Sequence, residues 1–526
     1  VQEADGYLGT YAPERRFMQP QPPGPRTWDG APGKRTWDIW THSYLILGML
    51  EMHRCFPEGA YLQCAQRIGD LCLRTLTGGG IDVTHLGNHF GMSATILLDP
   101  AVELYFETKE PRYLTLAERI LEQANARVEL ALLPQALAGV DAAEIATGKA
   151  YQLCWNMVGL AKLHRATGNA EYLQAVENVW RSIRTYHLSL GGGPWGGIAH
   201  RSREVFNHHG AFSPYAYIET CSTFSWMQLN RELLAITGEA RYAEEIERSA
   251  YNDLLAAQAP DGENWCYYIY PNGKRVYTTY WRCCKSSGAM ALEELAPVAY
   301  SVGSDGSIAV NLYGDSVAEL TTSAGRVTIE QTTRYPFDGA IALVIRPARP
   351  TRFTLELRIP AWAVDARVSV NGVPVTGEIV PGAYLDIAYN WCDGDVVAID
   401  LPMQPQLHHQ ISQNTQESLA PDGSPVRQQV MRYDYCAITR GPLVYATGLI
   451  DGFKTEETIR LPAAPNDALE LLDRPDGYEG RAIRLHLGSR PPLDFLPYFE
   501  AGGRVDGSWR LTWLQVAAPD NLNTQN

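Results

Sequence analysis

The stretch "ATGNAEYLQAVENVWRSI" (166–183) sets the pattern of the first half of the chain. Gly168 stands where a helix would end, because glycine readily adopts the left-handed conformation of a helix C-cap. After a short turn, Tyr172 opens a segment whose apolar residues recur at helical spacing. These residues are Leu173, Val176, Trp180 and Ile183. The stretch therefore predicts two helices joined by a tight turn.

The same design occurs in four places. Each copy has a turn followed by a tyrosine that begins an amphipathic segment, and the four tyrosines are Tyr61, Tyr113, Tyr172 and Tyr242. A repeat of helix hairpins at such intervals is typical of a helical toroid or an α-solenoid. We count about nine helices before residue 305, whereas a closed (α/α)6 barrel has twelve. We therefore expect that the sequence as given lacks the first helices of such a barrel.

The periodicity changes near residue 305. The segment "RFTLELRI" (352–359) alternates apolar and polar residues, as a strand with one buried face does. The segment "RVSVNGVPV" (367–375) carries an Asn-Gly pair that is typical of a β-hairpin turn. We predict a helical toroid or α-solenoid over 1–304 and one or two antiparallel β-sandwiches over 305–526, with 413–429 as a polar loop.

Composition excludes several classes of partner. The net charge of −15 argues against binding to nucleic acid or to an anionic membrane, and it leaves a neutral substrate open. No apolar run approaches the length of a membrane span. Ten cysteines in 526 residues do not form a disulfide framework. The sequence begins at Val1 without a signal-peptide pattern, so a cytoplasmic or a periplasmic location stays open.

Two short motifs, "ETC" (219–221) and the pair Cys283–Cys284, suggest a metal site. Zinc prefers thiolate ligands in tetrahedral sets of four and also accepts carboxylate oxygen. Glu219, Cys221, Cys283 and Cys284 make such a set. The alternative is that the adjacent cysteines are unrelated buried thiols. A thiolate that faces a pocket is also a candidate nucleophile.

The order of motifs along nearly the whole chain resembles glycoside hydrolase family 127, the β-L-arabinofuranosidase-type enzymes. The motifs are "DGYLGTY", "DIWTHSYLILGML", "ATGNAEYLQAVENVW", "ETC", "RYAEEIERSAYNDLLAAQAPDG", "CC", "VNLYG", "YPFDG", "LRIPAW", "VSVNG" and "RGPLVYA". The resemblance implies that residues 1–304 form an (α/α)6-barrel catalytic domain followed by β-sandwiches. It also implies a zinc ion on Glu219, Cys221, Cys283 and Cys284. It also implies that Cys283 is the nucleophile and Glu204 the acid/base. The expected function is a retaining hydrolase that releases a terminal furanose-like pentose from plant or microbial glycans.

The chain departs from the family pattern around the expected sugar site. Lys149 follows Gly148 where many members have histidine, and Arg282 and Lys285 flank the cysteine pair. These cations would suit an acidic branched sugar such as aceric acid. Candidate sugar contacts are His89, Tyr151, Trp195 and His208. A polysaccharide lyase and a non-catalytic zinc-containing sugar-binding protein remain as alternatives, and the assembly, a homodimer among others, stays open.

Overall fold

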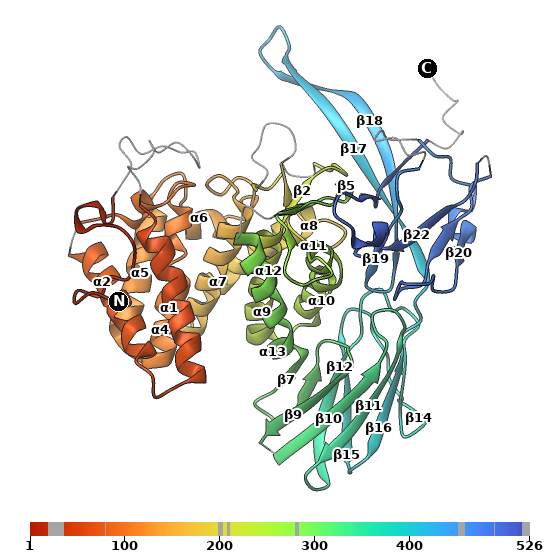
Figure 1. Ribbon diagram of the computed structural model, residues 1–526, viewed down its shortest axis with the longest axis horizontal. Coiled ribbons are helices and arrows are strands. Elements are labelled where there is room, and N and C mark those ends of the chain that lie inside the picture. Colours follow the sequence, from red (N-terminus) through yellow and green to blue (C-terminus); the bar gives the residue numbers. More distant parts are fainter. Residues whose placement is uncertain are drawn as a thin grey trace. The chain divides into compact units, whose positions relative to one another are not determined.

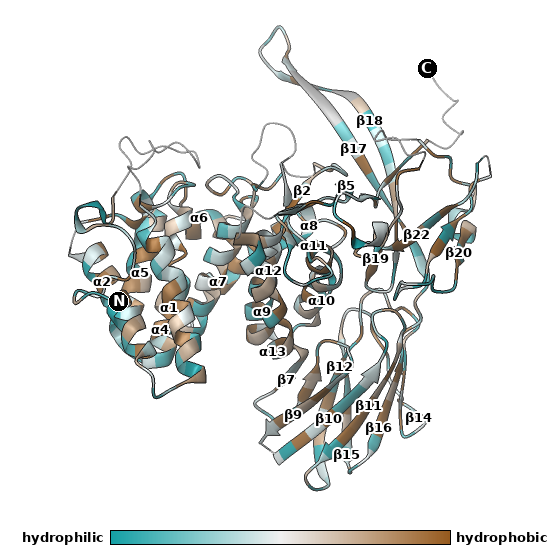
Figure 2. Ribbon diagram, in the orientation of Figure 1, coloured by the Kyte–Doolittle hydropathy of each residue, from teal (hydrophilic) through white to brown (hydrophobic). Residues whose placement is uncertain are grey.

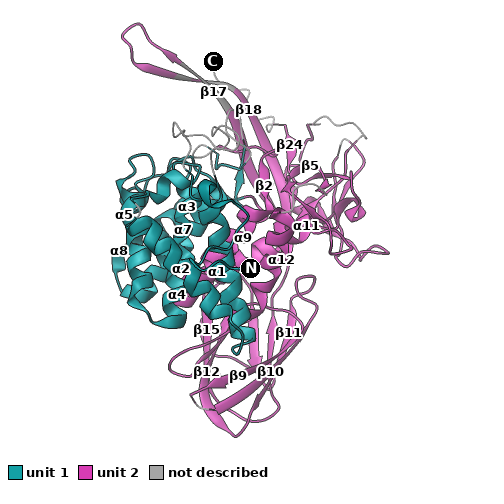
Figure 3. Ribbon diagram, turned by 60° about the vertical axis from the view of Figure 1, so that its left-hand side comes forward, with its two compact units in different colours: residues 1–188, 194–210 teal, residues 189–193, 211–526 magenta. Residues whose placement is uncertain are grey.

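The computed structural model describes residues 1–18, 36–78, 80–197, 204–207, 211–278, 283–323, 325–450, 458–488 and 490–517. The chain divides into two compact units (Figure 3). Unit 1 comprises residues 1–188 and 194–210, and unit 2 comprises residues 189–193 and 211–526. No helix among the described residues is both long enough and apolar enough to cross a membrane.

Unit 1 is built from three helix hairpins (Figure 1). They pair α1 (Asp38–Cys55) with α2 (Tyr61–Thr77), α4 (Leu98–Thr108) with α5 (Pro111–Ala126), and α7 (Ala150–Thr167) with α8 (Ala170–Tyr186). The first helices of the hairpins contact one another in the order α1, α4, α7, and α2 contacts α5. The short elements are η1 (Pro13–Arg15), η2 (Val83–Leu86), α3 (Met92–Thr95), α6 (Leu132–Leu137) and β1 (Trp195–Gly196). This gives an inner and an outer layer of helices, the arrangement expected from the repeat.

The hairpin at 166–183 forms as the sequence predicts. Gly168 ends α7 with φ at 73°, and the Asn169 side chain accepts a hydrogen bond from Glu171 N at 3.0 Å to cap α8. Residues 150–163 of α7 are buried without interruption, whereas only one face of α8 is buried. Helix α7 therefore belongs to the inner layer and α8 to the outer one.

Unit 2 begins with the remaining helices. They are α9 (Thr220–Thr237), α10 (Ala240–Ser249), α11 (Leu255–Ala257), α12 (Cys283–Glu293) and α13 (Leu295–Ala299). A π-helical turn, η3 (Ala250–Leu254), joins α10 to α11. Short strands connect them: β2 (Tyr217–Glu219), β3 (Trp265–Cys266), β4 (Tyr268–Ile269), β5 (Asn272–Lys274) and β6 (Tyr277–Thr278). In the described part of the chain before residue 305, nine helices have ten or more residues, in agreement with the predicted count.

A β-sandwich follows, with a six-stranded sheet facing a four-stranded one. The first sheet has the order β14-β13-β16-β11-β10-β9 and the second β15-β12-β8-β7. The strands are β7 (Tyr300–Val302), β8 (Ile308–Val310), β9 (Ser316–Thr322), β10 (Gly325–Thr333), β11 (Ala340–Pro347), β12 (Thr351–Arg358), β13 (Arg367–Val370), β14 (Val373–Pro374), β15 (Tyr384–Trp391) and β16 (Asp395–Asp400). Only β8 and β12 pair in parallel among these strands.

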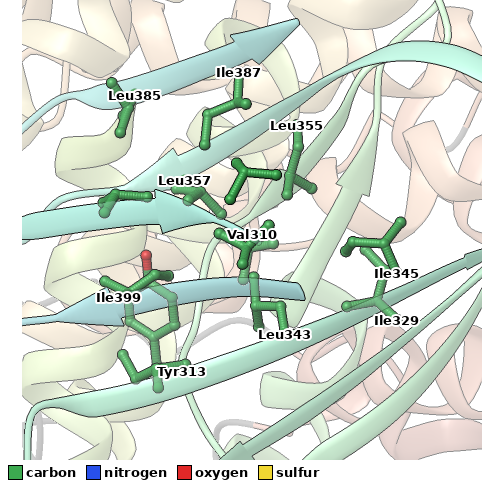
Figure 4. Close-up of a cluster of buried hydrophobic side chains, with 14 of the residues drawn as sticks. Val310, Tyr313, Ile329, Leu343, Ile345, Leu355, Leu357, Leu385, Ile387 and Ile399 are labelled. Carbon is green, nitrogen blue, oxygen red and sulfur yellow. The ribbon is translucent and has the colours of Figure 1, made fainter. Parts of the chain in front are cut away.

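The sandwich core confirms the alternation read from the sequence. Leu355 and Leu357 of β12 point into the same apolar cluster as Ile329 and Leu343 of the facing sheet (Figure 4). Hydrophobic and hydrophilic residues alternate along the sandwich strands in Figure 2. Asn371, with φ at 51°, and Gly372, with φ at 79°, form the tight turn between β13 and β14. The predicted fold class, a helical domain followed by antiparallel β-domains, is thus confirmed.

A third sheet closes unit 2, in the order β17-β18-β19-β22-β21-β20 with β24 beside β18. Its strands are β17 (Pro405–Leu419), β18 (Pro425–Arg440), β19 (Leu443–Ala446), β20 (Leu469–Leu471), β21 (Ile483–Leu485), β22 (Leu493–Pro497) and β24 (Leu514–Val516), with η4 (Pro465–Ala468) and η5 (Ala501–Arg504) between them. The polar loop expected over 413–429 is wrong, because these residues form the outer part of the β17–β18 hairpin (Figure 1). Only residues 420–424 turn the chain.

Two asparagine side chains join this last sheet to the helical part of unit 2. Asn252, in the π-helical turn, donates to Pro442 O at 2.9 Å and accepts from Val444 N at 2.8 Å. Asn272, in β5, accepts from Thr512 N at 2.9 Å and donates to Trp513 O at 2.7 Å. Both asparagines are buried, so these bonds replace contacts with water.

Candidate active site

The three cysteines of the predicted set come from the first turns of two neighbouring helices. Cys221 is the second residue of α9, and Cys283 and Cys284 are the first two residues of α12. Helices α9 and α12 pack against each other. Their sulfur atoms all lie within 4.8 Å of one another, although about sixty residues separate the two motifs.

Local contacts hold these two helix ends in place. Strand β2 pairs with β4, and Thr220, which begins α9, donates its hydroxyl to Cys266 O at 2.8 Å. On the other helix, Gly288 packs directly on Trp265. A Cβ at this position would lie 2.4 Å from the indole ring, which is too close for any larger residue to fit without a shift. The glycine thus lets the first turns of α12 approach β3 closely.

The three thiols differ in exposure and in protonation. Cys221 and Cys284 are buried, whereas Cys283 is exposed. Hydrogen bonds from Cys221 and Cys284, assisted by the Tyr267 side chain, lower the pKa of Cys283 to about 3. The hydrogen bond to Cys283 raises the pKa of Cys221, and burial raises the pKa of Cys284. The cluster therefore carries its negative charge on the thiol that solvent can reach.

The donor set fits a metal ion. The Sγ atoms of Cys221 and Cys284 lie 3.2 Å apart, and thiolates at such a separation repel each other unless a cation lies between them. Thiolate sulfur is a preferred ligand of soft and borderline metal ions. The three cysteines could therefore hold a metal ion, and binding would ionise the two buried thiols as well.

Glu219 is buried beside this cluster at the N-cap of α9. Its Oε2 atom accepts a hydrogen bond from Ser222 Oγ at 2.9 Å. Its charge also contributes to the raised pKa values of Cys221 and Cys284, after the hydrogen bonds and the burial named above. The role of Glu219 as a fourth ligand stays a prediction, since the three sulfur atoms alone form the compact donor group.

Glu204 belongs to unit 1, where it pairs with the lysine that departs from the family pattern. Lys149 Nζ lies 2.8 Å from Glu204 Oε2, and the two side chains are 5% and 17% exposed. Ala150 N donates to Glu204 O at 3.1 Å, and Phe206 N donates to Gly148 O at 2.8 Å. These backbone bonds fix the carboxylate beside the start of α7.

The other predicted sugar contacts lie in unit 1 or outside the described residues. His89 is buried with φ at 55°, and its Nδ1 lies 2.6 Å from Thr147 Oγ1. Tyr151 and Trp195 are buried, and Tyr151 shares a hydrogen bond with the Tyr44 hydroxyl. His208 and Arg282 lie outside the described residues, whereas Lys285 is exposed on α12.

Two functional features were missed from the sequence. Tyr267 lies between β3 and β4 and stabilises the Cys283 thiolate. On the inner helices of unit 1, the rings of Trp40 and Tyr44 lie 6.0 Å and 4.9 Å from that of Trp155, which forms an aromatic cluster. Aromatic pairs at spacing i, i+4 on α1 were a signal for the second feature, whereas no local pattern marks Tyr267.

The architecture consists of helix hairpins followed by antiparallel β-domains. The profile of the β-L-arabinofuranosidase GH127 catalytic domain matches residues 1–296, and that of the GH127 middle domain matches residues 307–403. The chain belongs to glycoside hydrolase family 127, the β-L-arabinofuranosidase family. It is a glycoside hydrolase of the β-L-arabinofuranosidase-like kind.

Individual relatives are distant. A non-reducing end β-L-arabinofuranosidase from Bifidobacterium longum subsp. longum is 22% identical over 97% of this chain and 83% of its own length. A solved GH127 β-arabinofuranosidase structure is 21% identical, with a TM-score of 0.75 over 98% of this chain and 82% of that one. A GH127 β-L-arabinofuranosidase from Geobacillus stearothermophilus T6 is 22% identical, with a TM-score of 0.72 over 98% and 84%. At this identity the solved structures show the fold.

Proposed function

We propose that this protein is a zinc-dependent retaining glycosidase that releases a terminal furanose-like pentose, of the β-L-arabinofuranoside type, with Cys283 as nucleophile. The supporting observation is the exposed Cys283 thiol, whose pKa lies at about 3 beside two buried thiols. A thiol of this kind is ionised at neutral pH, and the thiolate is the nucleophilic form. Family membership favours a hydrolase over a lyase or a non-catalytic binding protein.

The proposed reaction proceeds in two displacements. Cys283 Sγ attacks the anomeric carbon and forms a C–S bond, while the glycosidic C–O bond breaks and Glu204 donates a proton to the leaving oxygen. In the second step the Glu204 carboxylate accepts a proton from water, whose oxygen bonds to the anomeric carbon as the C–S bond breaks. Cys283 is released as thiolate, and two inversions return the original anomeric configuration.

We infer that Glu219, Cys221, Cys283 and Cys284 would hold the zinc, as a set of one carboxylate and three thiolates. Bound zinc supplies a positive charge that keeps these thiols deprotonated and fixes their positions. In the metal-free protein, hydrogen bonds from Cys221, Cys284 and Tyr267 act on the Cys283 sulfur in the same direction. Once zinc ionises Cys221 and Cys284, Tyr267 remains as the donor among these three.

One experiment tests the stereochemistry and the metal together. A nitrophenyl β-L-arabinofuranoside is hydrolysed inside an NMR tube, and the zinc content of the same preparation is measured by elemental analysis. We expect the β-anomer of the free sugar to appear first, with about one zinc per chain. Initial release of the α-anomer would contradict the double displacement, and full activity in metal-free protein would contradict the zinc requirement.

A second candidate substrate is an acidic branched sugar such as aceric acid, because the Lys149 ammonium is buried beside Glu204. A substrate carboxylate that entered this site would pair with the cation. The two candidates are distinguished by kcat/KM on a neutral and a carboxylate-bearing glycoside. If the acidic sugar is the substrate, Lys149→Met should reduce kcat/KM on the acidic glycoside far more than on the neutral one.

A further inference from the structure

Two arginines are buried together on a small two-stranded sheet of unit 2. Arg510 lies in β23 (Trp509–Leu511), and Arg275 follows directly after β5. They are 0% and 1% exposed. Arg510 is paired with Gly273, and Arg275 N donates to Ser508 O at 2.8 Å. Residues paired across a ladder share a face, as do residues two apart along a strand, so the two arginines are diagonal neighbours on one face.

Most of their hydrogen-bond donors lack an acceptor. Among the described residues, Nε, Nη1 and Nη2 of Arg510 and Nε and Nη1 of Arg275 have no hydrogen-bond partner. Arg275 Nη2 donates to Phe499 O at 2.9 Å. The Tyr498 ring covers one face of the Arg510 guanidinium, with its centroid 4.2 Å from Cζ, which leaves the edge donors to be satisfied. A buried donor without an acceptor costs about 1–3 kcal/mol, and more when it is charged.

The two positive charges are also incompletely balanced. Burial and the charge of Arg510 lower the pKa of Arg275 to about 10, which shows that the two cations repel each other. The charge of Arg510 acts on the carboxyl group of Asp253, which is also buried. Its carboxylate accepts hydrogen bonds from Ser189 Oγ and, at 2.7 Å, from Gly193 N. Arg248 acts on the same carboxyl group, so Asp253 is shared among several cations.

We propose that Arg275 and Arg510 form a binding site for a small monovalent inorganic anion, with chloride as the expected occupant. The site offers unpaired N–H donors on the edges of two buried guanidinium cations, which a spherical monovalent anion satisfies. Full burial of both side chains excludes a large organic anion. Bound chloride would join β23 to β5 and would stabilise unit 2 through mass action.

The site is tested on the wild-type chain by halide titration and by crystallography. In isethionate buffer of constant ionic strength, replacing isethionate with chloride should raise Tm by several degrees and then saturate. Crystals soaked in bromide should show an anomalous peak between the Arg275 and Arg510 guanidinium groups. A Tm that is equal in both salts, or a water molecule without anomalous signal at this position, would overturn the proposal.

Variants locate the effect. Arg510→Met should abolish both the chloride dependence of Tm and the bromide peak. If that protein does not fold, Arg275→Lys is the second variant. It keeps the positive charge at position 275 but removes the two unpaired guanidinium donors, Nε and Nη1. This variant should require at least tenfold more chloride to reach half of the Tm shift. Arg484→Met is the matched control, because Arg484 forms an exposed ion pair with Asp494 at 2.7 Å. An unchanged chloride response in both buried-site variants would contradict the assignment.

Discussion

Cys221 Sγ and Cys284 Sγ lie 3.2 Å apart, although each belongs to the first turn of a different helix. Both thiols are buried, and neither faces the solvent as Cys283 does. The pair is therefore placed to bind a metal ion together with Cys283, which is the thiol that solvent reaches.

Replacing either buried cysteine should remove the metal and destabilise the protein. In Cys221→Ser and Cys284→Ser a hydroxyl replaces a thiolate, which is the preferred zinc ligand, and metal binding is coupled to folding. We expect less than 0.2 zinc per chain and a Tm lower by several degrees. Cys72→Ser is the matched control, since Cys72 is a buried cysteine of unit 1 and is not a member of the cluster. It should lose stability but keep its zinc, and equal zinc content in all three variants would refute the metal site.

Replacing each of the two proposed catalytic residues should impair hydrolysis in a different way. Cys283→Ser should abolish turnover of every substrate, because a serine hydroxyl is a poor nucleophile without its own base. Glu204→Gln should slow hydrolysis of an alkyl or sugar glycoside by roughly 10²–10⁴-fold, the usual size of general acid catalysis. The first step with a nitrophenyl glycoside needs no acid, so a thioglycosyl adduct should accumulate in this variant, and intact-mass spectrometry should detect it.

Azide provides the complementary check on Glu204. As a nucleophile that needs no general base, azide should restore turnover of the nitrophenyl glycoside by Glu204→Gln and yield a glycosyl azide. Equal losses on both types of substrate, with neither adduct nor rescue, would show that Glu204 is not the acid/base. Glu263 would then be the next carboxylate to replace.

Alkylation of Cys283 should depend little on pH. Hydrogen bonds from the two buried thiols lower its pKa to about 3, so the thiolate persists as the pH falls from 8 to 5. An ordinary thiol loses about tenfold in reactivity for each pH unit below its pKa of about 8.5. We expect a flat rate of iodoacetamide labelling at Cys283 over this range, followed by peptide mass spectrometry, with glutathione as the reference. A tenfold fall per unit at Cys283 would contradict the structure.

A buried ion-pair network should make unit 1 sensitive to acid. Glu103 accepts from Lys162 Nζ at 2.7 Å and from Arg54 Nη2 at 2.8 Å. Burial raises the pKa of Glu103, but these two cations outweigh burial and lower it to about 2. Because the folded-state pKa lies below the ordinary value of 4.5, the stabilisation is complete above pH 5 and is lost as the pH falls toward 2.

Glu103→Gln should therefore reduce the free energy of unfolding at pH 7 by about 3 kcal/mol, from roughly 1.4 kcal/mol per pKa unit. The difference from the wild type should shrink between pH 5 and pH 2. Urea unfolding at several pH values measures it. Glu107→Gln, on the same helix, is the control, because Glu107 also contacts Arg54, at 3.3 Å, but is more exposed. A difference that is constant with pH would show that the charge of Glu103 is not the cause.

Local sequence patterns predicted most of the helices and strands, because helix ends and buried strand faces depend on residues that are close in the sequence. Gly168 and Gly238 end their helices with φ at 73° and 68°, as their positions in the repeat indicate. The alternation of apolar and polar residues in β12 corresponds to one buried face of the strand. The hairpin at 413–429 was missed because the sequence from Gln413 to Ser418 is polar at every position and so lacks the alternation of a strand with one buried face.

The candidate site was predictable where residue chemistry alone marked it. Adjacent cysteines and a preceding Glu-Thr-Cys pointed to a common cluster, and the structure brings the three sulfur atoms together. Tyr267 could not be found in this way, since it stands among several tyrosines and reaches Cys283 only after β4 pairs with β2. The ion pair of Lys149 with Glu204 likewise depends on a long-range contact of the backbone.

The asparagine bridges of unit 2 bear on how this protein completes its folding during synthesis. Asn252 bonds a segment 190 residues further along the chain, and Asn272 bonds one 241 residues further. Helices α9 and α12 can therefore leave the ribosome long before the partners of these amides have been translated. Until then these amides bond to water instead of to their native partners. We expect that a nascent chain stalled before residue 442 holds the helices around the cysteine cluster less firmly, and that it binds zinc more weakly than the chain that includes these partners.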